Sequence, residues 1–183
     1  MKFSEDMIER KLITENVLQE KVRELGKQIS ADYEGEELVL ITLLKGGAIF
    51  SVDLMRSISV PVELDFMCVS SYGSSTKTSG AVKVVKDLDT DIAGKNVLIV
   101  EDIIDSGKTL SYLVKYLELK GAHSVRTCTL LDKPARREVD FIPDYCGKTI
   151  PDKFVVGYGL DYDEKFRNLP YIGILKPEVY GGT

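Results

Sequence analysis

The stretch of residues 96–110, NVLIVEDIIDSGKTL, constrains the fold of this chain more than any other. The apolar, largely β-branched run at 97–100 predicts a buried strand, and the acidic pair Glu101 and Asp102 follows it directly. A short polar turn then leads into a helical pattern that begins at Thr109. Ligands of open α/β sheets bind beyond the carboxyl ends of the strands. The acidic pair is therefore expected in a ligand-binding crevice.

The turn between this strand and helix, DSGKT at 105–109, has the features of a phosphate site. It offers closely spaced backbone N–H groups, two hydroxyls and a helix N-terminus. The two carboxylates before it can accept sugar hydroxyls and hold a hydrated Mg²⁺. The end of the turn also matches the nucleoside triphosphatase loop G-x-x-x-x-G-K-[ST], but Asp102 replaces the first glycine that this loop requires. An ordinary Asp-Ser-Gly turn is the remaining alternative.

Composition and charge exclude several classes of protein. The 183 residues show no shift in composition and no apolar run long enough for a membrane span, so one domain over 1–183 is expected, with no membrane partner. The N-terminal residues MKFSED lack the apolar core of a signal peptide, which favours the cytoplasm. A net charge of −5 argues against a general nucleic-acid surface. The single histidine, His123, excludes an H-E-x-x-H zinc site, so acid–base chemistry falls mainly to carboxylates and lysines.

Strand and helix patterns alternate along the rest of the chain. A continuous apolar run at 38–44 predicts a buried strand of a parallel sheet, and Lys45, Gly46 and Gly47 break it before a helical pattern. Amphipathic or helical patterns cover 14–29, 48–57 and 110–120, and extended patterns cover 60–69, 81–87 and 125–131. This alternation predicts a doubly wound α/β fold with a mainly parallel sheet and helices on both faces. Taken alone, the two glycines could simply permit a tight turn.

The polar segment 70–80, SSYGSSTKTSG, is too long and too polar to be an ordinary connection inside a compact domain. Its place between two predicted strands favours a mobile loop that closes over a site. A plain flexible hairpin is the alternative.

The stretch VLIVEDIIDSGKTL at 97–110 resembles the phosphoribosyl pyrophosphate signature of type I phosphoribosyltransferases, and its Glu-Asp-Ile-Ile-Asp version resembles the 6-oxopurine branch. The resemblance continues through LLKGGAIF at 43–50, the segment 70–80, LLDKPARR at 130–137 and PDKFVVGYGLDYDEKFRNLP at 151–170. It implies the type I fold with a small hood subdomain. The hood would come from the N-terminal segment and about 133–183, with a mobile loop over about 70–82.

The resemblance also implies an activity in purine salvage. Phosphoribose would pass from 5-phosphoribosyl 1-pyrophosphate to N9 of hypoxanthine or guanine, with Mg²⁺ as cofactor, giving IMP or GMP and pyrophosphate. A homodimer or homotetramer is expected. One alternative is a phosphoribosyltransferase-like regulator that binds nucleic acid. Another is a pyrimidine or adenine enzyme, which a lysine donor facing the 6-position of the base disfavours.

Residue roles follow by resemblance alone. Asp105 would be the catalytic group that accepts a proton from the purine, since a free aspartate is ionised at neutral pH. Phosphoribose and its 5′-phosphate would contact Glu101, Asp102, Asp105, Ser106, Gly107, Lys108, Thr109 and Leu110. The purine would contact Lys133, Phe154, Val155 and Asp161, and Ser71 and Tyr72 would begin the mobile loop. Pyrophosphate would contact Lys45, Gly46 and Arg167, and Mg²⁺ would be held by Glu101, Asp102 and Asp161.

Two details complete this prediction. The peptide between Lys45 and Gly46 contacts pyrophosphate in the relatives and can be cis there. The charged residues Asp163, Glu164 and Lys165 are interpreted as solvated side chains of a turn.

Overall fold

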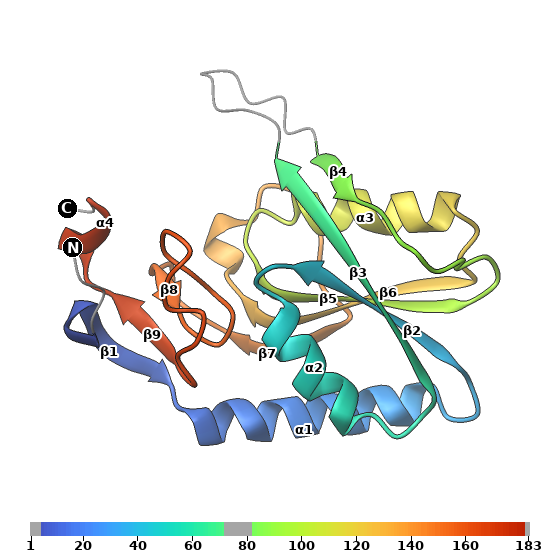
Figure 1. Cartoon of the computed structure of the whole chain (residues 1–183), viewed down its shortest axis with the longest axis horizontal. Helices are drawn as coiled ribbons and strands as arrows, with labels where there is room; N and C mark the ends of the chain where they lie inside the picture. Colours follow the sequence, from blue (N-terminus) through green and yellow to red (C-terminus); the bar gives the residue numbers. More distant parts are fainter. Residues whose placement is uncertain (1–4, 72–81, 182–183) are drawn as a thin grey trace.

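The larger of two sheets carries the predicted strands. The structure is a computed structural model that describes residues 5–71 and 82–181. In the larger sheet the strand order is β4-β3-β2-β5-β6-β7 (Figure 1). Its strands are β2 (Leu38–Leu44), β3 (Val62–Ser71), β4 (Val82–Lys86), β5 (Asn96–Ile104), β6 (Ser124–Asp132) and β7 (Tyr145–Thr149). All neighbours pair in parallel except β3 and β4. The chain proceeds outward in opposite directions from β2 and β5, so the ligand crevice is expected where these two strands end.

Helices cover both faces of this sheet because side chains alternate along its buried strands. In β5, Leu98 and Val100 join the core beneath α1 (Glu15–Asp32) and α2 (Ala48–Ser57). Val97 and Ile99 join the core on the opposite face, beneath α3 (Lys108–Leu119). Figure 1 shows these helices on the two sides of the sheet. The predicted doubly wound fold is confirmed.

A smaller antiparallel sheet lies beyond the carboxyl ends of the parallel strands (Figure 1). It joins the N-terminal strand β1 (Ile8–Ile13) to β9 (Ile172–Leu175), which also pairs with β8 (Val155–Val156). Short helices complete the chain: η1 (Glu5–Met7), η2 (Pro134–Arg136) and α4 (Pro177–Tyr180). This sheet holds the N-terminal strand and two strands from the range 133–183 predicted for the hood, but β7 (Tyr145–Thr149), which lies in the same range, belongs to the larger sheet.

Several predicted elements differ in detail from the observed ones. β5 continues through Ile104, so Glu101 and Asp102 lie inside the strand and not after it. β1 and β7 were not predicted. Most of the predicted loop over about 70–82 lies outside the described residues, as does Tyr72, while Ser71 is the last residue of β3.

The suggested cis bond was placed one residue too late. The cis peptide lies between Leu44 and Lys45 and not between Lys45 and Gly46. β2 pairs with β3 as far as Leu44, so the chain leaves the sheet at this bond.

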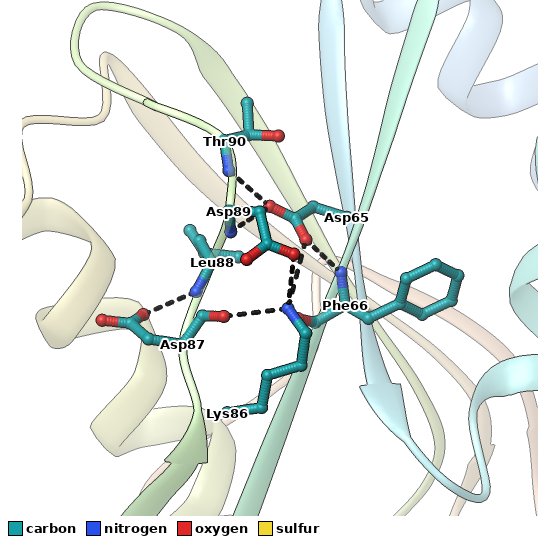
Figure 2. Close-up of polar contacts among 7 residues, drawn as sticks. All are labelled: Asp65, Phe66, Lys86, Asp87, Leu88, Asp89 and Thr90. Atoms are coloured by element: carbon teal, nitrogen blue, oxygen red, sulfur yellow. Dashed lines mark hydrogen bonds and ion pairs between the residues drawn. The ribbon is translucent and has the colours of Figure 1, made fainter.

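The connection from β4 to β5 is held by a buried carboxylate on β3. Asp65 is 5% exposed and accepts N–H bonds from Phe66, Asp89 and Thr90 at 2.7 to 2.9 Å (Figure 2). Lys86 lies beside it and donates to the main-chain oxygens of Phe66 and Asp87. Burial alone would raise the pKa of Asp65, but the backbone donors outweigh it and the pKa is lowered. Asp65 therefore anchors this connection as a carboxylate.

Candidate active site

The end of β5 and the start of α3 enclose a cavity of about 250 Å³. It is lined by Glu101, Asp102, Ile103, Ile104, Asp105, Ser106, Gly107, Thr109 and Leu110. Gly107 precedes α3 with a φ of 79°, a conformation that glycine adopts without steric cost. Because the first N–H groups of a helix have no partner within it, the cavity is suited to an anion. Of the predicted phosphate-binding residues, only Lys108 is missing from this lining, and its side chain pairs with Glu138.

This turn is braced from outside by the residues after β6. Arg137 donates to the main-chain oxygen of Asp105 at 2.7 Å and pairs with the Asp132 carboxylate. The N–H groups of Glu138 and Val139 donate to the main-chain oxygen of Ser106 at 3.0 and 3.3 Å. Sequence reasoning included Arg137 in the motif LLDKPARR but assigned it no role. Its signal was the second arginine of that motif, which pairs with Asp132 of the same motif and with Asp105 of another loop.

Glu101 and Asp102 form an acidic pair at the base of the cavity. Asp102 is 7% exposed, and burial raises the pKa of its carboxyl group. Burial, followed by the neighbouring Asp102 carboxylate, raises the pKa of Glu101 well above its usual range. The buried Asp102 carboxylate beside the partly buried Glu101 carboxylate favours any ligand that supplies hydroxyl donors or positive charge.

A second cavity of about 350 Å³ lies between β5 and the small sheet, and it contains every predicted purine-binding residue. Its lining comprises Asp102, Ile103, Asp105, Lys133, Arg136, Asp152, Lys153, Phe154, Val155, Leu160, Asp161 and Tyr180. Asp102, Ile103 and Asp105 line both cavities, so the two adjoin. Lys133 is 6% exposed, with its Nζ 3.6 Å from Asp105 Oδ1. Sequence reasoning did not single out Ile103 or Tyr180.

Two polar atoms of this region are buried without a hydrogen-bond partner among the described residues. They are Asp105 Oδ1 and Arg167 Nε. Buried polar atoms are normally paired, and leaving one unpaired is costly. Asp105 Oδ1 has the ion pair with Lys133 at 3.6 Å but no hydrogen bond, so one acceptor and one donor in the site keep hydrogen-bonding capacity for a ligand.

The two cations predicted to bind pyrophosphate lie on neighbouring loops. Arg167 donates to the main-chain oxygen of Gly159 at 2.7 Å and pairs with Asp161 at 2.9 Å. Lys45, which is exposed, pairs with Glu164 at 2.8 Å, and Arg167 lies 3.4 Å from the same carboxylate. Glu164 is solvent-exposed, as interpreted, but it also pairs with Lys45 of a distant loop, which the sequence did not indicate. Glu164 bridges both cations.

Gly46 brings the turn after β2 against the acidic pair. A Cβ at this position would overlap the Asp102 carboxylate, lying 2.6 Å from its Cγ. A Cβ on Gly159, where φ is 104°, would overlap the main-chain oxygen of Gly46. Gly46 is thus enclosed between β5 and the loop that carries Arg167.

The predicted magnesium ligands do not form a complete cage. Within residues 5–71 and 82–181, no three His, Cys, Asp or Glu side chains converge as a metal site. Asp161 accepts from Arg167 and from the N–H of Glu164 at 2.9 Å. Mg²⁺ commonly binds through one or two carboxylates plus substrate phosphates and water, and the adjacent Glu101 and Asp102 fit that pattern.

Comparison with known proteins places this geometry in a family. The phosphoribosyl transferase domain family matches residues 13–163. A bifunctional protein TilS/HprT of Listeria innocua is 56% identical over 94% of this chain, which spans 27% of that protein's length. A hypoxanthine-guanine phosphoribosyltransferase of Bacillus subtilis is 53% identical over 94% of this chain and 96% of its own length.

A solved structure agrees with these relatives. The crystal structure of a hypoxanthine phosphoribosyltransferase from Staphylococcus aureus has a TM-score of 0.92 and 48% identity, covering 96% of this chain and 95% of that one. The family match over residues 13–163 includes β2 to β7 and every residue that lines the two cavities except Tyr180. The chain therefore belongs to the phosphoribosyl transferase domain family, in its hypoxanthine-guanine phosphoribosyltransferase branch.

Proposed function

We propose that this protein acts in purine salvage, transferring phosphoribose from 5-phosphoribosyl 1-pyrophosphate to N9 of hypoxanthine or guanine. The products are IMP or GMP and pyrophosphate. The observation that carries the proposal is the pair of adjoining cavities that share Asp102, Ile103 and Asp105. One cavity suits a sugar phosphate and the other suits a planar base with an oxo group. The shared residues lie where the bond between base and sugar would form.

Each half of the substrate pair has a set of contacts. The 5′-phosphate accepts the N–H and hydroxyl groups of the 105–110 turn, and Glu101 and Asp102 accept the ribose hydroxyls. Lys133 donates to the 6-oxo group of the purine, and the ring stacks on Phe154. Val155 contributes its main chain to the exocyclic edge of the base.

Charge separates as the reaction proceeds. Departure of pyrophosphate before full attack gives an oxocarbenium-like transition state, as in glycosyl transfer generally. Lys45 and the free Arg167 Nε bind the departing anion. Asp105 Oδ1, which is buried without a hydrogen-bond partner and lies 3.6 Å from Lys133 Nζ, accepts the N7 proton of the base as N9 forms the new bond to the sugar, with inversion at that carbon.

Magnesium is proposed as the cofactor. Glu101 and Asp102 would hold it together with water and substrate oxygens, and Asp161 would serve a second ion. When bound, Mg²⁺ offsets the negative charge that builds on pyrophosphate. Asp161 pairs with Arg167 at 2.9 Å, so it would either release Arg167 to bind the ion or contact both at once.

The nucleic-acid-binding regulator gains no support. The curated relatives are phosphoribosyltransferases or contain one, and the purine-binding residues share one cavity.

None of the described helices is long and apolar enough to cross a membrane. We propose a cytoplasmic homodimer or homotetramer, built from one domain over 1–183 with the base bound beneath the small sheet.

The test is a comparison of purines. Pyrophosphate release is measured with 5-phosphoribosyl 1-pyrophosphate and hypoxanthine, guanine, xanthine or adenine, in MgCl₂ and in EDTA. Turnover with hypoxanthine or guanine in MgCl₂, and loss of it in EDTA or with adenine, is expected. No turnover with either oxopurine contradicts the proposal, and specific gel shifts with RNA or DNA would then favour the regulator.

A further inference from the structure

The short helix α4 places an aromatic ring in the cavity proposed for the purine. Tyr180, the last residue of α4, lines the same cavity as Lys133 and Phe154. The rings of Tyr180 and Phe154 are stacked, with centroids 4.9 Å apart and planes 26° apart. The motifs that carry the proposed function end at residue 170, so they assign nothing to Tyr180.

Phe154 stays partly open although two tyrosine rings contact it, since it is 37% exposed. Tyr180 stacks over one of its faces, and Tyr162 packs against it in a T-shaped arrangement, with centroids 5.7 Å apart and planes at 88°. A base inserted between the two stacked rings would need them about 7 Å apart, which is twice the carbon–carbon contact distance of about 3.5 Å. The observed 4.9 Å leaves no such space. The base must therefore use the face of Phe154 that Tyr180 does not cover.

Tyr180 is held in place by main-chain and side-chain contacts. The Tyr162 hydroxyl donates to the main-chain oxygen of Val179 at 3.0 Å. The N–H of Lys176 donates to Met7, which ties the start of α4 to the segment before β1 at 3.0 Å. Val179 and Tyr180 also pack against a small buried cluster comprising Met7, Val156, Phe166 and Leu175. Contacts from three parts of the chain thus fix the ring that covers Phe154.

We propose that Tyr180 is a positioning residue for purine binding, which stacks on the rear face of Phe154 and holds that ring in the orientation that the base needs. This inference rests on the proposed function. A side chain that is already ordered loses less conformational entropy when a ligand binds. Tyr180 therefore raises affinity for the base and acts on neither the phosphate turn nor the chemical step.

The experiment measures the effect of one substitution on the Michaelis constant of each of the two substrates. Tyr180→Ala should raise the KM for hypoxanthine and guanine by about 3- to 10-fold, which is what one aromatic stack is worth in affinity. The KM for 5-phosphoribosyl 1-pyrophosphate and kcat should stay within about twofold. Tyr180→Phe should restore the wild-type KM, because the ring and not the hydroxyl makes the stack. Tyr180→Leu should behave like Tyr180→Ala while retaining apolar bulk.

Tyr112→Ala is the matched control. Tyr112 stacks on Tyr116 with centroids 5.9 Å apart and is 38% exposed on α3, outside both cavities. The Tyr112→Ala substitution should leave the KM for the base unchanged. An unchanged KM in Tyr180→Ala, or a lower KM that would mean the ring blocks the base, overturns the inference. Wild-type protein without turnover on either base would instead reject the proposed function.

Discussion

The Asp102 carboxylate occupies the space that a side chain on Gly46 would need. A Cβ there would lie 2.6 Å from Asp102 Cγ, and Asp102 is nearly fully buried. The turn after β2 and the acidic end of β5 are therefore in direct contact, with no room for a residue larger than glycine. Both belong to the proposed site for the sugar and its leaving group.

Gly46→Ala should displace Asp102 or the turn and lower kcat/KM for 5-phosphoribosyl 1-pyrophosphate by about 10²-fold, since a misplacement of about 1 Å can cost this much. Steady-state kinetics on folded protein measures it. Gly94→Asn is the control, because nothing lies within 4 Å of a Cβ at Gly94 and asparagine tolerates its φ of 73°. Activity of Gly46→Ala close to that of the control would contradict the account.

Asp105→Asn should lower kcat by about 10²- to 10⁴-fold, the usual contribution of a proton acceptor in the transition state. The main-chain oxygen of Asp105, which Arg137 holds, is unaffected by this change. Binding of 5-phosphoribosyl 1-pyrophosphate, measured by calorimetry, should therefore remain within about threefold. Wild-type turnover in the variant would remove Asp105 from the proposed role.

Glu164→Gln should lower the KM for 5-phosphoribosyl 1-pyrophosphate. Glu164 bridges Lys45 and Arg167, so its carboxylate competes with pyrophosphate for both cations. The ion pairs are exposed and therefore weak, so the expected fall in KM is at most about fivefold. The KM for the base should not change. Asp163→Asn, a neighbouring exposed carboxylate, is the control, and a raised KM in Glu164→Gln would show that Glu164 orients the cations for the substrate.

Asp65→Asn should destabilise the fold by about 1–3 kcal/mol at pH 7, because three backbone donors lose an ionised acceptor (Figure 2). The pKa of Asp65 is lowered in the folded protein, so its contribution is complete above its unfolded value of about 4. It disappears as the pH falls through the lower folded value. Urea unfolding at pH 7 and below pH 4 measures the difference between wild type and variant.

The difference in free energy of unfolding between wild type and Asp65→Asn should shrink in acid. Asp89→Asn is the control, since Asp89 also accepts from Lys86 but its side chain is 85% exposed. It should cost well under 1 kcal/mol. An equal loss of stability in both variants, or a difference that grows in acid, would contradict the role assigned to Asp65.

Elements with a strong local pattern were predictable from the sequence. The run at 38–44 is apolar throughout and ends at Lys45 and Gly46, and β2 and α2 have the predicted bounds. β1 was missed because its sequence IERKLI shows no clear alternation. It becomes a strand only by pairing with β9, where Ile8 faces Leu175 from the opposite end of the chain. Propensity within one segment cannot reveal such a partner.

The residues of the candidate site likewise divide into those that the sequence predicts and those that it does not. The residue types around Asp105 and Lys133 were visible in short motifs, and the fold brings them into one cavity. The ion pair of Glu164 was not foreseen because its partner Lys45 lies 119 positions away. Tyr180 follows the last motif and acquires a place in the cavity only when α4 packs beside Phe154. These roles depend on tertiary contacts and have no local signal.

The central claim is that the bend at residues 105–110 grips the 5′-phosphate while Glu101 and Asp102 hold the sugar. A crystal structure of the protein with GMP tests it most directly. The phosphoryl group should lie in the smaller cavity against the N–H groups of 106–110, with the base beside Lys133 and Phe154. A phosphoryl group bound anywhere else would contradict the account.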